Sequence, residues 1–194
     1  MSGNMKTSQD SASSFLQSVR KARSYGIGEF LEIIGELSQE STKKGRLGRK
    51  TKELITFGIA LGKQCERCIC IHADDARKLG ATRDELEQVR KIALFLRSTP
   101  HEDEHLWKTW KNAWKQFVLG KGALATHERE LVALGISIIM QHRKHIKLHV
   151  RQALKFGRNG AEIIEVLPIA LLMDGAPALS QIPHLIKAIE KYSH

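Results

Sequence analysis

The sequence predicts an all-α protein with a duplicated helical-hairpin fold. Apolar residues recur at helical spacing, as at Leu86, Val89, Ile92 and Leu96. The 194 residues include only 4 prolines, and no long segment alternates apolar with polar residues as a half-buried strand would. In addition, the sequence repeats itself after 77 residues, which indicates two copies of one helical unit.

The repeat divides the chain. Residues 53–94 align with residues 130–171 without a gap, and fifteen of the forty-two positions are identical, where unrelated sequences would share about two or three. We expect a disordered lead-in over 1–12, a first repeat over 13–98 and a degenerate second repeat over 99–194. The identical positions of the first copy are Glu53, Leu54, Gly58, Ile59, Gln64, Ile69, His72, Ala76, Lys78, Gly80, Glu85, Val89, Ile92, Ala93 and Leu94.

Apolar stripes and capping residues place the helices. Phe30, Ile33 and Leu37 mark one stripe of the early chain. Gly80 is typical of a helix end, and Thr82 with Glu85 predicts a capping box at the next helix start. The expected helices span residues 11–24, 27–41, 49–62, 66–79, 83–97, 103–119, 126–141, 144–156, 160–173 and 178–191.

The helix over 103–119 is expected to bridge the two copies. Trp107, Trp110 and Trp114 lie at positions i, i+3 and i+7 and so form one aromatic face. Core packing is the favoured interpretation of this face. A surface that stacks on a ligand or another subunit is the alternative.

The chain is strongly basic, with a net charge of +10 and an isoelectric point near 9.7. Such a charge suits a nucleic-acid binder, but the cations are scattered along the sequence. The densest stretch, residues 43–52, indicates a basic loop leading into a helix, without aromatic stacking residues or zinc-finger spacing. We expect a solvated surface and no nucleic-acid partner, and a nucleic-acid-associated scaffold is the alternative.

No segment predicts secretion or a membrane partner. The first residues are polar and lack the apolar core of a secretory signal. The longest apolar run, residues 131–140, is half as long as a membrane helix requires. We therefore expect a cytoplasmic protein.

The three cysteines, Cys65, Cys68 and Cys70, lie within six residues and indicate redox or metal chemistry rather than a disulfide framework. Cys65, Cys68 and His72 share one helix face, and the helix start at Cys65 favours a thiolate. A Cys pair at this spacing can close a disulfide. His72 is placed to accept a proton from Cys68.

Two further residues bear on this site. Glu53, in the preceding helix, is expected to fold back toward His72 and orient its imidazole. Zinc binding by the three cysteines and His72 is an alternative. We disfavour it because Cys70 faces away from the other two, and we expect Cys70 to be a small buried residue.

These residues carry a family resemblance. Glu53, the segment from Cys65 to His72 and the segment from Lys78 to Glu85 resemble the carboxymuconolactone decarboxylase superfamily, and within it the alkylhydroperoxidase D-like (AhpD-like) branch. The resemblance implies a helical fold, assembly into rings and thiol-dependent reduction of hydroperoxides. It further implies that Cys68 attacks the peroxide, Cys65 resolves the product, His72 acts as the base and Glu53 completes the relay.

In the second copy, His142, His145 and His149 occupy the positions of Cys65, Cys68 and His72, and Glu130 occupies that of Glu53. Three histidines and a carboxylate are typical ligands of zinc, nickel or iron. The alternative is a decayed copy whose polar positions drifted. We favour this alternative because neighbouring lysines and arginines repel a cation.

We therefore expect a peroxidase with Glu53, Cys65, Cys68 and His72 as its catalytic residues. Its substrate is expected to be a hydroperoxide, and its reductant an external dithiol on a lipoyl- or thioredoxin-like protein. We expect no bound cofactor. A homotrimer is the expected assembly, because one copy alone has too few helices to bury its apolar faces. A non-enzymatic redox or metal sensor is the competing hypothesis.

Overall fold

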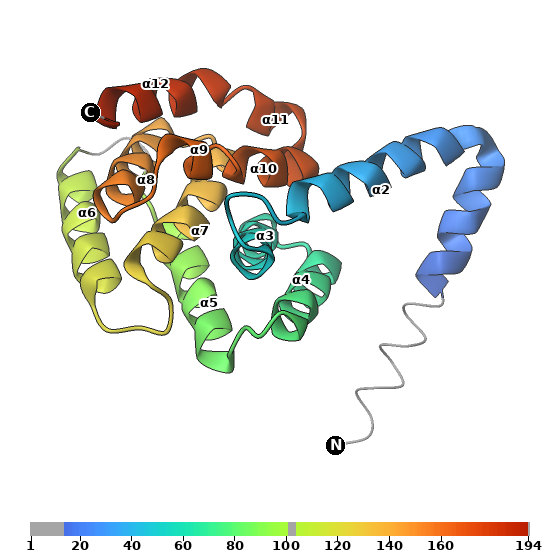
Figure 1. Cartoon of the computed structure of the whole chain (residues 1–194), viewed down its shortest axis with the longest axis horizontal. Helices are drawn as coiled ribbons and strands as arrows, with labels where there is room; N and C mark the ends of the chain where they lie inside the picture. The colour runs from blue at the N-terminus through green and yellow to red at the C-terminus, as the bar shows by residue number, and fades with distance from the viewer. Residues whose placement is uncertain (1–13, 101–103, 194) are drawn as a thin grey trace. The chain divides into compact units, whose positions relative to one another are not determined.

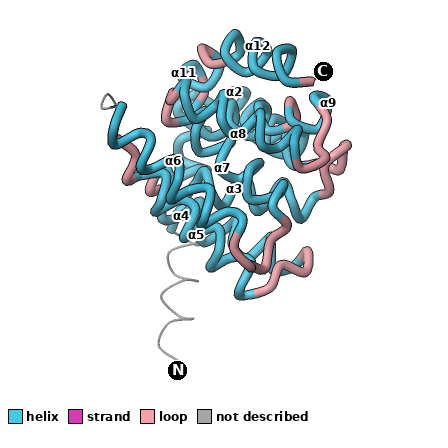
Figure 2. Tube along the Cα trace, turned by 90° about the vertical axis from the view of Figure 1, so that its left-hand side faces the viewer, coloured by secondary structure: helices cyan, strands magenta, loops and turns pink. Residues whose placement is uncertain are grey.

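The computed structural model describes residues 14–100 and 104–193, so the expected lead-in over 1–12 lies outside the described residues. Every regular element in these ranges is a helix (Figures 1 and 2). No described helix is long and apolar enough to cross a membrane. The chain divides into two compact units, residues 1–40 and 41–194.

The first unit is helical from residue 14. Residues 14–22 are followed by a π-helical turn, η1 (Arg23–Ile27), and by α2 (Gly28–Thr42), whose last two residues belong to the second unit. Gly26 has a φ of 100°, a left-handed conformation that only glycine adopts readily, and it ends the first helical segment. The break that the sequence predicted between residues 24 and 27 therefore lies at this glycine.

The second unit holds the remaining helices. They are α3 (Arg49–Lys63), α4 (Glu66–Lys78), α5 (Arg83–Arg97), α6 (Glu104–Leu119), α7 (Thr126–Ile139), α8 (Arg143–Lys155), α9 (Gly160–Ile163), α10 (Val166–Asp174), α11 (Ala176–Leu179) and α12 (Ile182–Tyr192). These bounds confirm an all-α fold, and the predicted capping box of Thr82 and Glu85 is present at the start of α5.

Two expected helices are each broken in the structure. The helix expected over 160–173 is divided into α9 and α10, and that over 178–191 into α11 and α12. Pro168 and Pro183 explain both breaks, because proline has no N–H to donate to the carbonyl four residues earlier. Those carbonyls belong to Ile164, which caps the end of α9, and to Leu179, the last residue of α11.

The core is organised around the contact between α3 and α7, which are the same helix in the two copies. A Cβ atom on Gly58 of α3 would lie 2.7 Å from Val132, and a Cβ on Gly135 of α7 would lie 3.0 Å from Ile55. The two contacts are equivalent after the 77-residue shift. The two copies therefore meet about a pseudo-two-fold axis, and the paired glycines let the helices approach closely.

Each copy also holds the loop of the other. The backbone N–H of Leu47 donates to the carboxylate of Glu165 at 3.1 Å, and the N–H of Leu124 donates to the amide oxygen of Gln88 at 2.7 Å. These two hydrogen bonds are again related by the repeat. Lys52 adds an ion pair to Glu165 at 3.1 Å. Since both leucines are buried, these latches satisfy backbone groups that have left water.

The Glu165 latch makes stability depend on pH. Burial raises the pKa of Glu165, but the N–H groups of Arg46 and Leu47 and the Lys52 ammonium outweigh it and lower the pKa below its ordinary value. A carboxyl with a lowered folded-state pKa stabilises the fold above its unfolded pKa. This stabilisation is lost as the pH falls through the folded pKa.

We expect Glu165→Ala to lower the free energy of unfolding at pH 7 by about 2 kcal/mol, because two backbone donors and Lys52 lose their acceptor. Glu165→Gln should cost less and should weaken the acid sensitivity, since an amide does not titrate. Urea unfolding at pH 7 and pH 4 measures both effects. Gln88→Ala is the matched control on the neutral latch. A pH dependence equally reduced by Gln88→Ala would contradict the assignment.

Candidate redox site

A tight turn between α3 and α4 positions the cysteine pair. Gln64 ends α3 with a φ of 58°, in the left-handed region, and the N–H of Cys65 donates to the carbonyl of Ala60 at 3.1 Å. This arrangement satisfies the last carbonyls of α3 and reverses the chain within two residues. Cys65 therefore becomes the N-cap of α4.

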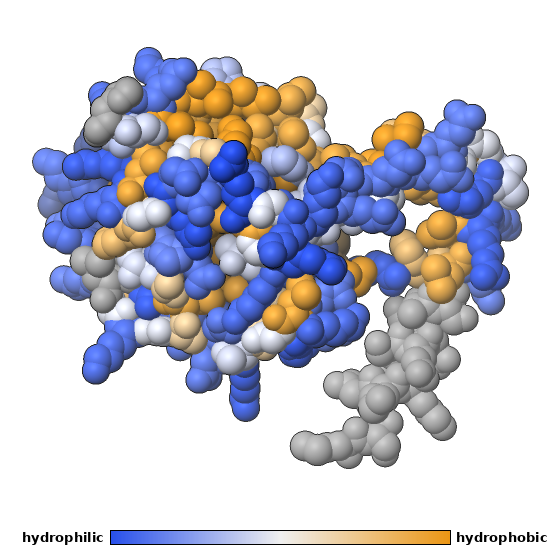
Figure 3. Space-filling model, viewed as in Figure 1, coloured by the Kyte–Doolittle hydropathy of each residue, from blue (hydrophilic) through white to orange (hydrophobic). Residues whose placement is uncertain are grey.

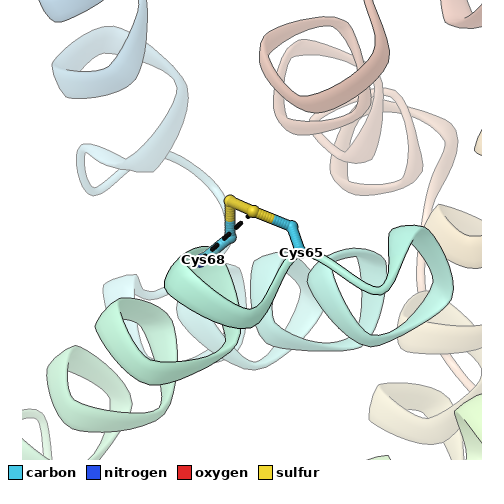
Figure 4. The surroundings of a disulfide bond; sticks show 2 residues. All are labelled: Cys65 and Cys68. Atoms are coloured by element: carbon cyan, nitrogen blue, oxygen red, sulfur yellow. Dashed lines mark hydrogen bonds between the residues drawn. A yellow bond between two sulfur atoms is a disulfide. The ribbon is translucent and has the colours of Figure 1, made fainter.

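Cys65 and Cys68 are joined as a disulfide, with their Cα atoms 5.3 Å apart (Figure 4). The Cys65 sulfur also accepts a hydrogen bond from the N–H of Cys68 at 3.3 Å. Both residues are half-buried, so the pair lies at the surface end of the helix. The expectation that this spacing closes a disulfide is confirmed. Cys70 was expected to be buried, but it is exposed and free, because it lies on the solvent face of α4.

Glu53 and His72 form the acid–base pair of the site. The carboxylate of Glu53, from α3, lies 2.9 Å from Nδ1 of His72, and their side chains are only 7% and 13% exposed. In a neutral imidazole bound in this way, Nδ1–H donates to the carboxylate and Nε2 is left as an acceptor. The structure thus places Glu53 beside His72, as the helical hairpin predicted. Among the described residues, no hydrogen bond joins His72 to either sulfur of the closed disulfide.

The second copy repeats this geometry with histidines. Glu130 lies 2.6 Å from Nδ1 of His149, and both side chains are fully buried. Nε2 of His149 lies 3.2 Å from Nδ1 of His145, while His142 takes the N-cap position and accepts from the N–H of His145 at 3.4 Å. These interactions form one continuous hydrogen-bonded chain from Glu130 to the start of α8.

Both ring nitrogens of His149 are engaged in this chain. Within residues 14–100 and 104–193, no group of three or more His, Cys, Asp or Glu side chains is arranged to hold a metal ion. Metal binding by His142, His145 and His149 stays a hypothesis that this geometry does not test. The polar positions of the second copy are used internally.

The tryptophan face of α6 closes the second copy. The ring of Trp110 packs edge-on against that of His145, with 4.2 Å between the ring centroids. The ring of Trp114 packs in the same way against that of His149, with 5.0 Å between the centroids. The indole N–H of Trp114 also donates to Glu130 at 3.3 Å. Core packing of this face is thus confirmed, since Trp110 and Trp114 are buried. The link from Trp114 to Glu130 was not anticipated, because periodicity shows which face is apolar but not which polar atom lies beneath it.

The second copy also indicates what the first can do when it is reduced. His145 is the counterpart of Cys68, and it contacts Nε2 of the histidine that corresponds to His72. By the repeat, Cys68 and His72 stand at the helix positions of these two histidines. The two histidines differ in their access to solvent. His149 is fully buried, whereas the side chain of His72 retains 13% exposure.

We expect Glu130→Ala to lower the free energy of unfolding by about 3 to 5 kcal/mol, because His149 and the Trp114 N–H lose a fully buried partner. Glu53→Ala removes the equivalent carboxylate from the more accessible copy and should cost about 1 to 2 kcal/mol. Urea unfolding of both variants tests the difference. Equal losses would contradict the claim that only the second copy is sealed.

Comparisons with known proteins agree with the duplication. The model of the carboxymuconolactone decarboxylase family matches the chain twice, over residues 28–112 and 104–188. An uncharacterized protein of Cupriavidus necator is 33% identical over 60 residues, a segment that covers 31% of this chain and 53% of that protein. The chain thus spans about half the length of this curated relative. No solved structure matches the chain.

Proposed function

The chain belongs to the carboxymuconolactone decarboxylase family, and from that premise we propose that it is a thiol-dependent peroxidase that reduces hydroperoxides in antioxidant defence. The observation that carries the proposal is the disulfide of Cys65 and Cys68 on the same helix as His72, which is bound to Glu53. A thiol pair, a base and a group that orients the base are what peroxide reduction by cysteine requires.

The first step uses Cys68 and His72. In the reduced protein, Nε2 of His72 accepts the thiol proton of Cys68, and Glu53 holds the imidazole in the matching tautomer. The thiolate attacks one oxygen of the hydroperoxide, and the O–O bond breaks. The leaving alkoxide takes the proton from His72 and departs as an alcohol, while the Cys68 sulfur becomes a sulfenic acid.

The second step uses Cys65. Its sulfur lies at the N-terminus of α4, where the positive end of the helix dipole favours a thiolate. This thiolate attacks the Cys68 sulfur, a disulfide forms, and the S–O bond of the sulfenic acid breaks. The departing hydroxide takes a proton from solvent and becomes water, which balances the proton that the Cys65 thiol released to solvent when it ionised. An external dithiol protein, lipoyl- or thioredoxin-like, then restores both thiols by two exchanges and is itself oxidised to a disulfide. The cycle needs no cofactor within the chain.

We expect Cys68→Ser to abolish peroxide consumption by the pre-reduced protein, measured by stopped flow with a dithiol reductant. Cys65→Ser should still react once and accumulate a sulfenic acid, which a dimedone-type trap reveals in mass spectrometry. Cys70→Ser is the matched control and should retain the wild-type rate, because this thiol is exposed on the other face of α4. Equal turnover by wild type and Cys68→Ser would end the proposal.

The role of His72 has its own readout. His72→Asn should slow the reaction about 100-fold at pH 7, and raising the pH should restore part of the rate because the thiol then ionises without a base. A variant that is merely misfolded would not recover in this way. A disulfide that forms and breaks without any peroxide turnover would instead favour the redox-sensor hypothesis.

We also propose that the protein assembles with itself, as a homotrimer. Exposed apolar side chains on two helices support this proposal. Leu179 of α11 is 53% exposed, and Ile186 of α12 is 38% exposed. Figure 3 shows hydrophobic surface where these helices lie in Figure 1. Exposed apolar patches of this kind are typical of subunit contacts.

Light scattering after gel filtration should therefore give about three times the chain mass of 21.8 kDa. Replacing Leu179 and Ile186 together by glutamate should reduce the mass toward that of one chain, because charged groups at an apolar contact lose their water. A wild-type protein that stays monomeric at 100 µM (roughly the upper range of such assays) would contradict the assembly.

A further inference from the structure

One face of α8 carries an unbroken row of cations. Arg143, Lys147, Arg151 and Lys155 follow one another at a spacing of four residues, and all four are exposed. This spacing places their side chains along a single line, about 6 Å apart on the helix axis. We call these four residues the basic ridge.

The basic ridge is flanked by further cations on both sides. Lys187 and Lys191 of α12 line one surface hollow together with Arg143 and Lys147. Lys191 also lines a second hollow together with Arg151 and Lys155. On the opposite side, Lys111 and Lys115 of α6 line a third hollow of about 260 Å³ together with Arg151 and Lys155. The ridge is therefore the centre of a wider basic surface, in which α8 shares hollows with α12 on one side and with α6 on the other.

Acidic partners do not neutralise the ridge. Among the described residues, none of its four cations forms an ion pair, whereas nearby Lys144 pairs with Glu104 and Arg158 pairs with Glu162. Like charges four residues apart on a helix destabilise it. Repulsion within this row is therefore not offset by acidic side chains of the described residues.

The first copy provides an internal comparison. The positions of α4 that correspond to the ridge carry Glu66, Cys70, Asp74 and Lys78. The same backbone position in the same fold is therefore mixed in charge on α4 and uniformly positive on α8. The helical scaffold does not require the ridge.

We propose that the basic ridge binds the phosphodiester backbone of a nucleic acid without regard to sequence. A nucleic-acid strand presents one negative charge at each nucleotide, a regular row that matches a regular row of cations. The two arginines of the ridge can hold phosphate oxygens with two N–H groups each. The sites of the thiol chemistry take no part in this contact.

The shape of the surface favours nucleic acid over other anionic partners. The flanking cations line hollows between helices, which a strand of phosphates can follow but a flat bilayer cannot enter. An acidic protein surface offers carboxylates at irregular spacing. Tyr192 lies in the hollow beside α12, with Arg151 at 5.7 Å and Lys191 at 5.9 Å from its ring, so aromatic surface accompanies the cations there.

The test measures binding of the full-length protein to a fluorescent 24-nucleotide DNA, single-stranded and as a duplex, by anisotropy at 50 to 200 mM salt. The ridge variant replaces Arg143, Lys147, Arg151 and Lys155 by glutamine. We expect it to bind at least about 10-fold more weakly than wild type at 50 mM salt. The slope of log affinity against log salt should fall by about 3, close to 0.7–0.9 for each lost phosphate contact.

A matched control carries the same change in net charge. It replaces Lys43, Lys44, Arg46 and Arg49, which are exposed in the basic loop and the first turn of α3, by glutamine. This control should lose less than about 3-fold in affinity. Circular dichroism and thermal unfolding verify that both variants fold.

Three results would overturn the proposal. One is no binding of either DNA by wild type at 50 mM salt. Another is an equal loss in the ridge variant and the matched control, which would show a general charge effect. The third is tighter binding to polyglutamate, or to vesicles containing phosphatidylserine, than to DNA, which would assign the surface to an acidic protein or a membrane.

Discussion

The close contact between α3 and α7 is the constraint on which the rest of this structure depends. Gly58 and Gly135 carry no side chain, so the two helices pack backbone against side chain at the centre of the core. Both carboxylates, Glu53 and Glu130, come from these helices, and each is directed to a histidine on the helix that follows. The crossing thus holds the two carboxylate-bearing helices together, and the hairpin of each copy brings its carboxylate to its histidine.

The same backbone has taken opposite chemical roles in the two copies. In the first, the N-cap and the residue three positions later are cysteines that can be oxidised and reduced. In the second, histidines at these positions join Glu130 in a buried chain that Trp110 and Trp114 cover. The polar groups of the second copy are bonded within a closed interior, whereas those of the first copy retain solvent access.

Much of this arrangement could be predicted because its signals are periodic. The repeat established the duplication, and helical spacing placed Cys65, Cys68 and His72 on one face. What could not be predicted depends on contacts between distant residues. The latch from Glu165 to Leu47 crosses 118 positions, and no local pattern encodes it. The prediction that Cys70 is buried was wrong, because a small apolar side chain occurs on both the buried and the solvent face of a helix.

The charge distribution is a further case. The densest basic stretch of the sequence is partly neutralised in the fold, since Lys50 pairs with Glu85 and Lys52 with Glu165. The cations of α8 are separated along the sequence and gather only when the helix forms. Linear charge density therefore does not show which cations gather on one surface of the fold.

Joining both copies in one polypeptide has a consequence for how the surface can change. In a dimer of identical chains, every substitution appears twice, once on each side of the axis. Covalent fusion removes that coupling, so α8 and α4 are free to diverge while the central helix crossing is preserved. The molecule is in effect a heterodimer whose partners are always present in equal amounts.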